Sequence, residues 1–230
     1  PFVLVSARMP DGIQPIRDQI GNHAPVVSYS GGLIQAADGT ILQSCQLELG
    51  MAVEIKELLE KEFPSVCCNT YGFHKWIVDD DTDPRIRNEE RITGLKSVCA
   101  DIRETFSEYG GIHKFLLMGD DAVIPMVRDR LEQLFPELSV AASSPVYLEV
   151  MNGSVKKSGG LRFLCDYYGI STEQSLAFGD GDVDLDMLLA AGRGYAMANA
   201  SEYVRENARY FTLDNEHEGV LVVLKEIFGV

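Results

Sequence analysis

The spacing of apolar residues predicts that strands and helices alternate along this chain. Apolar residues three and four positions apart indicate helices over residues 51–63 and 122–135. Short apolar runs, which are typical of buried strands, cover residues 2–5, 25–30, 66–78, 115–118 and 146–151. We expect the last of these runs to lead the chain back from an inserted domain into its core. Alternating elements of this kind predict an α/β fold.

A strand, a glycine-rich turn and a helix follow one another in the segment SLAFGDGDVDLDMLL, residues 175–189. The turn carries Asp180 and Asp184, and we expect Gly181 to let it close tightly. Open α/β sheets keep their sites at the carboxyl ends of strands, and carboxylate oxygens suit magnesium. The alternative is a plain connection in which Asp182 or Asp184 caps the helix that follows.

Two further groups suit the binding of phosphate. Ser6 and Ala7 follow the strand at residues 2–5, so that a hydroxyl again lies at the carboxyl end of a strand. Lys157 precedes a helix with apolar positions at Leu161, Leu164, Cys165 and Tyr168. A simple crossover needs only about a dozen residues. The much longer stretch between Ser6 and Lys157 therefore predicts an inserted domain.

With a hydroxyl, a lysine and a GDxxxD motif in this order, the chain resembles the haloacid dehalogenase superfamily of phosphotransferases. The resemblance is to its Cof-type branch with a type IIB cap, and it extends through VVSYSGGLIQAADGTILQ, VYLEVMNGSVKKSGGLRFL and AGRGYAMANASEYVRENARYFTLDNEHEGV. It implies a doubly wound, Rossmann-like core with a parallel sheet and an inserted α+β cap. The expected division is core at 1–47, cap at 48–151 and core again at 152–230. We expect the cap to be a sheet with helices on one face.

The resemblance also implies roles for single residues. Ser6, the amide of Ala7 and Lys157 would hold the phosphoryl group, and Asp180 would bind Mg²⁺. Asp184 would orient Lys157 or a metal-bound water. We expect Asp180 and Lys157 to be partly exposed, so that Asp180→Asn and Lys157→Ala each abolish turnover with little loss of folding.

Three positions depart from the family pattern. Val183 replaces the asparagine that usually precedes the second aspartate of the GDxxxD motif. Ala7 and Ser158 replace glycines that usually follow the hydroxyl and the lysine. Lys156 could take the place of Lys157 if the alignment shifts by one residue.

The nucleophile of the family is an aspartate in a DxDGT motif on the first core strand, some tens of residues before the hydroxyl. The DGT at residues 38–40 lacks the preceding aspartate and lies between apolar runs, which predicts a hairpin turn. We expect the working protein to carry the nucleophile in a segment before Pro1. Without the central strand that bears it, two apolar strand edges would lie open to aggregation.

The resemblance implies attack by the aspartate on phosphorus and hydrolysis of the resulting aspartyl-phosphate by water. The expected function is therefore that of a magnesium-dependent phosphatase acting on a small phosphorylated metabolite, with a sugar phosphate first among the candidates. A hexose phosphomutase is an alternative. So is a protein that binds a phosphorylated ligand without turnover, if the mature chain begins at Pro1.

Composition and charge narrow the partners and the location. The chain is 46% hydrophobic, and no apolar run approaches the ~18 residues needed to cross a membrane. A net charge of -15 with no basic patch argues against nucleic acid. Five cysteines with no paired spacing predict reduced thiols and a cytoplasmic location. The acidic run at residues 79–83 is interpreted as a solvated loop, and the oligomeric state is left open.

Overall fold

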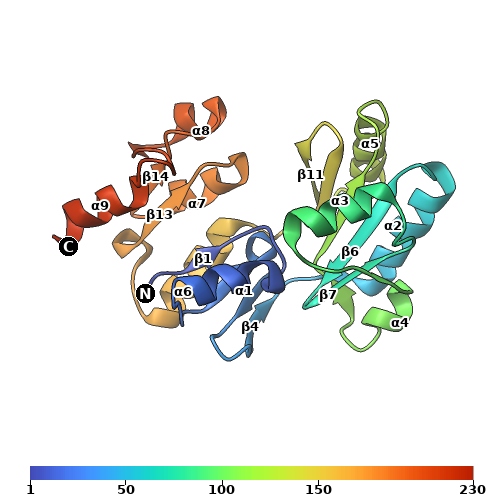
Figure 1. Cartoon of the computed structure of the whole chain (residues 1–230), viewed down its shortest axis with the longest axis horizontal. Helices are drawn as coiled ribbons and strands as arrows, with labels where there is room; N and C mark the ends of the chain where they lie inside the picture. The colour runs from blue at the N-terminus through green and yellow to red at the C-terminus, as the bar shows by residue number, and fades with distance from the viewer. Residues whose placement is uncertain (230) are drawn as a thin grey trace. The chain divides into compact units, whose positions relative to one another are not determined.

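The computed structural model of the chain describes residues 1–229 and is shown in Figure 1. It divides into two compact units, Pro1–Val155 and Lys156–Val230. The sequence analysis predicts two boundaries between core and cap, at residues 47/48 and 151/152, whereas this division has one, at 155/156. The two predicted boundaries stay predictions.

The first unit begins with a small sheet that follows the predicted strands. Its elements are β1 (Leu4–Val5), α1 (Pro10–Gln19), β2 (Val26–Ser28), the 3-10 turn η1 (Tyr29–Gly31), β3 (Leu33–Gln35) and β4 (Ile41–Ser44). The strands pair in this order, β1 with β2 in parallel and the others antiparallel. Between β3 and β4, the amide of Thr40 donates to Asp38 Oδ1 at 2.9 Å, and Gly39 takes a left-handed φ of 86°. The predicted hairpin turn at residues 38–40 is confirmed.

A six-stranded sheet forms the rest of the first unit, in the order β11-β12-β10-β6-β7-β8. Its strands are β6 (Cys67–Gly72), β7 (Lys75–Val78), β8 (Val98–Cys99), β10 (Lys114–Met118), β11 (Leu138–Ser144) and β12 (Tyr147–Asn152). The helices are α2 (Leu49–Glu62), α3 (Pro84–Thr93), α4 (Ile102–Phe106) and α5 (Ile124–Leu134), and β5 (Leu47–Glu48) pairs with β9 (Gly111–Ile112). The predicted helices at 51–63 and 122–135 are confirmed as α2 and α5. The run at 66–78 is a hairpin of two strands.

Both faces of this sheet are covered, as the alternation along β10 requires. Phe115 and Leu117 belong to a core formed with α2, α4 and α5. Leu116 and Met118 lie in a second core with Ile86 of α3 and with residues of the amino-terminal segment. The expectation of helices on one face only is therefore wrong, because Ile86 gives α3 an apolar side to bury.

The run at residues 146–151 does not lead directly back to a core sheet. It forms β12, which pairs antiparallel with β10 and β11. Leu148 and Val150 of β12 are fully buried in the core with α2 and α5. β12 is therefore the last strand of this sheet, and the chain continues from it to α6; its place as the return to the core stays a prediction.

The second unit alternates helices with parallel strands. Its elements are α6 (Lys157–Tyr168), η2 (Thr172–Gln174), β13 (Leu176–Gly179), η3 (Asp182–Asp184), α7 (Leu185–Ala190), β14 (Arg193–Ala196), α8 (Glu202–Asn207), β15 (Tyr210–Phe211) and α9 (Gly219–Phe228). The three strands pair in parallel in the order β13-β14-β15. The predicted α/β class with parallel strands is confirmed. Among residues 1–229, no helix is long and apolar enough to cross a membrane.

Candidate active site

The turn after β13 is built around a close approach between Gly179 and Asp184. A Cβ on Gly179 would lie 2.5 Å from the Cβ of Asp184, a distance that real side chains do not reach. Only glycine therefore allows Asp184 to fold back against the end of the strand. Gly181, which the sequence singled out, has an ordinary φ of -90° and an open surrounding, the nearest atom to an added Cβ being 3.4 Å away.

Asp184 uses both of its carboxylate oxygens inside this turn. Oδ2 accepts the amides of Asp180 at 3.1 Å and of Gly181 at 2.9 Å. Oδ1 forms an ion pair with Nζ of Lys157. Asp184 is the N-cap residue of α7, but its side chain makes no hydrogen bond to that helix. The capping alternative is therefore wrong for Asp184, whose carboxylate binds the preceding turn and the predicted phosphate lysine.

Lys157 is the first residue of α6 and is buried, with 8% of its side chain exposed against 10% for Asp184. The expectation of a partly exposed lysine is wrong, because α6 packs on α7 and covers the ion pair. The start of α6 is fixed a second time, since Asp186 Oδ2 accepts the amide of Ser158 at 3.0 Å. Lys156, the alternative candidate, is exposed.

Asp180 is exposed at the carboxyl end of β13, as expected. Its Oδ2 accepts a hydrogen bond of 2.8 Å from Nδ2 of Asn199, on the loop after the neighbouring strand β14. The next residue but one, Ser201, donates to Asp182. The sequence analysis gave Asn199 no role, although it also follows a parallel strand at its carboxyl end and could have been found by that rule.

These residues fit a magnesium ion to a limited extent. Magnesium takes hard oxygen ligands, keeps several waters and often binds only one or two carboxylates. Asp180 offers such an oxygen beside its bond to Asn199, whereas Asp184 is fully engaged. Within the described residues, no three His, Cys, Asp or Glu side chains gather as a metal site.

Ser6 and Ala7 lie in the first unit, directly after β1. The amide of Ser6 donates to the carbonyl of Val27 at 2.9 Å, which continues the parallel pairing with β2 by one residue. The amide of Arg8 donates to Ser6 Oγ at 3.2 Å. The hydroxyl is therefore held in a tight turn at the carboxyl end of its strand, as predicted, and both residues are half-buried.

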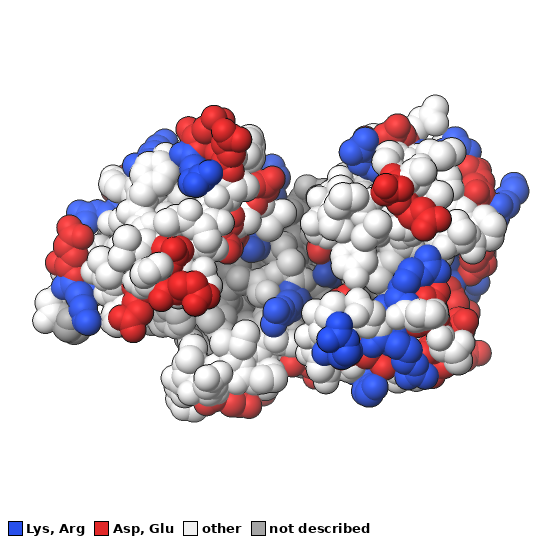
Figure 2. All heavy atoms as spheres, turned by 45° about the horizontal axis from the view of Figure 1, so that its top comes forward, with Lys and Arg blue, Asp and Glu red and all other residues white. Residues whose placement is uncertain are grey.

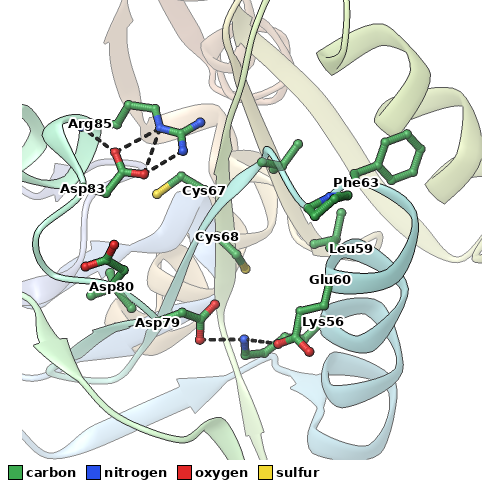
Figure 3. A pocket seen from close by; sticks show the side chains of 13 residues that line it. Lys56, Leu59, Glu60, Phe63, Cys67, Cys68, Asp79, Asp80, Asp83 and Arg85 are labelled. Atoms are coloured by element: carbon green, nitrogen blue, oxygen red, sulfur yellow. Dashed lines mark hydrogen bonds and ion pairs between the residues drawn. The ribbon is translucent and has the colours of Figure 1, made fainter.

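A cavity of about 310 Å³ lies elsewhere in the first unit, between α2 and the loop after β7 (Figure 3). All but one of the charged side chains in its lining are paired with one another. Nζ of Lys56 lies 2.6 Å from carboxylate oxygens of both Glu60 and Asp79, and Arg85 pairs with Asp83 at 2.6 Å. The predicted phosphate and metal residues are not among its lining, so this cavity is not the candidate site.

The acidic run that borders this cavity has structural roles. Asp83 caps α3 by accepting the amide of Arg85 at 2.8 Å, and Asp80 accepts the amide of Thr82 at 2.8 Å. The interpretation as a solvated loop is confirmed.

Burial raises the pKa of Cys67 and of Cys68 to about 12, and all five cysteines are free thiols.

Charge is distributed without a large single-sign region on the face shown in Figure 2, where acidic and basic side chains are interspersed. The chain carries 35 acidic against 20 basic side chains. An anionic substrate must therefore be attracted by local cations rather than by the overall field.

Known proteins resemble this chain along nearly its whole length. The sequence pattern of the family described as haloacid dehalogenase-like hydrolase matches residues 1–224. A Haemophilus influenzae protein described as a phosphatase is 34% identical over 228 residues, which cover 99% of this chain and 85% of the relative. A 5-amino-6-(5-phospho-D-ribitylamino)uracil phosphatase of Bacillus subtilis is 28% identical over 217 residues, with coverage of 90% and 77%.

A solved structure shows the same fold. The haloacid dehalogenase-like hydrolase from Bacteroides thetaiotaomicron matches with a TM-score of 0.88 at 27% identity, covering 98% of this chain and 86% of that chain. The predicted Rossmann-like core with an inserted cap is thereby confirmed. With a family pattern that spans nearly its whole length and relatives that are phosphatases, the chain belongs to the haloacid dehalogenase-like hydrolases and is a phosphatase of that superfamily.

Proposed function

We propose that the protein is a magnesium-dependent phosphatase that acts on a small phosphorylated metabolite, with a sugar phosphate as its substrate class. The observation that carries the proposal is the ion pair of Lys157 and Asp184 beside Asp180 at the carboxyl end of β13. It provides a cation that can bind phosphoryl oxygens next to a carboxylate that can bind a hard metal ion.

The substrate class is supported by one of the relatives. The Bacillus subtilis protein is named for a substrate in which the phosphate is carried by a ribityl group, a sugar alcohol. A chain related to it over 90% of its own length is a reasonable candidate for a phosphorylated sugar or polyol. The free cysteines support a cytoplasmic location as part of the same proposal.

The proposed mechanism gives each residue a task. Nζ of Lys157 has three N–H donors and uses one on Asp184, so that others can bind phosphoryl oxygens. The hydroxyl of Ser6 and the amide of Ala7 would bind further phosphoryl oxygens. Asp184 would keep Lys157 in place, and Asp180 would hold the magnesium. Bound magnesium would offset the repulsion between an anionic nucleophile and the phosphoryl oxygens.

The covalent step needs a nucleophilic carboxylate, which the family supplies from a DxDGT motif that the 230 residues do not contain. In the proposed reaction this carboxylate attacks phosphorus, the alcohol leaves, and water opens the aspartyl-phosphate to give inorganic phosphate. A carboxylate suits this role because the mixed anhydride that it forms is readily hydrolysed.

The experiment is a phosphate-release assay on the full-length protein with sugar phosphates, nucleotides and an aryl phosphate, each with magnesium and with a chelator. We expect release from sugar phosphates with magnesium, and a loss of roughly 100-fold or more in Asp180→Asn. Undiminished release with chelator or in Asp180→Asn would refute the metal site. Turnover only with a bisphosphate activator would indicate a phosphomutase, and binding without turnover a phosphate-binding protein.

A further inference from the structure

Lys114 connects the six-stranded sheet of the first unit to the turn at residues 6–8, called the phosphate loop below because it carries the predicted phosphate ligands Ser6 and Ala7. It lies on β10 and is 7% exposed. Its Nζ donates a hydrogen bond of 3.2 Å to the carbonyl of Ala7, which follows Ser6 at the end of β1. A buried cation thus contacts the main chain of a loop that is 107 positions away in sequence.

Lys114 has two other neighbours, and both lie farther from Nζ than the carbonyl of Ala7 does. Tyr71, its partner in register on β6, places its ring centroid 5.4 Å from Nζ, and Glu149 Oε2 on β12 is 3.5 Å away. At 3.2 Å the Ala7 carbonyl is the nearest of these partners, and Glu149 forms a longer ion pair with the same ammonium group.

The contact reaches the hydroxyl of Ser6 through a single peptide group. The carbonyl of Ala7 and the amide of Arg8 are the two ends of the same peptide, and that amide donates to Ser6 Oγ at 3.2 Å. A positive charge on the carbonyl polarises the peptide and strengthens its N–H as a donor, since hydrogen bonds in a chain reinforce one another. A hydroxyl that accepts such a bond keeps its own proton for another acceptor.

We propose that Lys114 is a positioning residue for the phosphate loop, which acts through the Ala7–Arg8 peptide to aim the hydroxyl of Ser6 at a phosphoryl oxygen. The proposal rests on the proposed function, because it takes Ser6 as a phosphate ligand. It makes the geometry of the phosphate loop depend on a residue of the inserted sheet.

The test is a double-mutant cycle on the full-length protein, read by calorimetric binding of inorganic phosphate in the presence of magnesium. We expect Lys114→Met to weaken phosphate binding about tenfold, which corresponds to about 1.4 kcal/mol. In a Ser6→Ala background the same change should have no further effect, because the hydroxyl that it positions is gone. Equal weakening in both backgrounds, or none in either, would overturn the proposal.

Two further variants separate positioning from folding. Lys75→Met is the matched control, since Lys75 also lies on the inserted sheet above a tyrosine ring, 5.3 Å from the centroid of Tyr109. It should bind phosphate like the wild type. Lys114→Gln keeps a neutral donor and, should Lys114→Met fail to fold, carries the cycle in its place with an expected weakening of about threefold. If Lys114→Gln, with Ser6 unchanged, then bound phosphate as tightly as the wild type, the proposal would be refuted.

The outcome also distinguishes this proposal from the proposed function. One outcome is that phosphate binding depends on Lys114 and Ser6 but no phosphate ester is hydrolysed. This would refute the proposed hydrolysis of sugar phosphates and leave the positioning role of Lys114 intact. Absence of phosphate binding by the wild type would refute both.

Discussion

Removing the charge of Lys157 should destabilise the protein by about 3 kcal/mol, in contrast to the small loss that the sequence alone predicts. Its ion pair with Asp184 is buried, with 8% and 10% of the two side chains exposed. Breaking a buried pair from one side costs about 3–5 kcal/mol, because the remaining charge stays buried without compensation. Asp184 Oδ2 keeps two amide donors, which places the expected loss at the lower end of that range.

The assay is urea unfolding at pH 7, monitored by circular dichroism, of the Lys157→Met variant. This substitution keeps most of the aliphatic stem and removes the charge. For a chain of this size, 3 kcal/mol should also lower the melting temperature by about 6–12 °C. Asp180→Asn is the matched control, since Asp180 is exposed and should change stability by less than about 0.5 kcal/mol. Adding Asp184→Asn to Lys157→Met should restore part of the loss.

The reasoning would be refuted if Lys157→Met unfolded at the same urea concentration as the wild type. It would also be refuted if Asp184→Asn made the lysine variant less stable still, since the cost is attributed to an uncompensated carboxylate.

Three other predictions follow from single contacts. Gly179→Ala should displace Asp184 and lower phosphate release at least about tenfold, whereas Gly181→Ala should fold and act nearly normally, because only the first Cβ would overlap Asp184. Asn199→Ala should raise the magnesium concentration for half-maximal activity about tenfold by freeing Asp180, and an unchanged value would count against the contact. Burial lowers the pKa of His113 to about 4. The unfolded chain, with a pKa of about 6.5, therefore binds a proton first, and stability should fall by about 3 kcal/mol from pH 6.5 to pH 4. Urea midpoints of wild type and His113→Gln over this range check this, and parallel profiles would contradict it.

The sequence predicts those parts of the fold that local rules control. Asp-Gly between two apolar runs is a hairpin signal, and Thr40 and Asp38 form that turn. The carboxyl-end rule places Asp180 correctly, because β13 is a parallel strand that ends one residue before it. In each case the deciding interactions lie within a few residues of one another.

Other features depend on partners that are distant in sequence. The apolar strand β12 could have completed either of two sheets, and only its pairing with β10 decides between them. The burial of Lys157 follows from Asp184, 27 positions later, and from the packing of α6 on α7. The spacing of residues in a sequence does not show such contacts between distant positions. The sequence therefore predicted a partly exposed lysine.

The residues that the sequence analysis missed have a physical property in common that bears on how the site is tested. Asn199 supports Asp180, and Lys114 supports the loop of Ser6, each from a strand or loop far along the chain. The motif residues Lys157 and Asp184 combine the proposed chemistry with a buried ion pair, so that changing one of them alters stability and activity together. The two supporting residues contact Asp180 and the main chain of Ala7, and neither is proposed to bind phosphate or magnesium itself. Asn199 is exposed, so that its variant can separate the positioning of a metal ligand from the stability of the fold, which substitutions in the motif itself cannot do. Lys114 is buried, and for it the double-mutant cycle with Ser6 makes that separation.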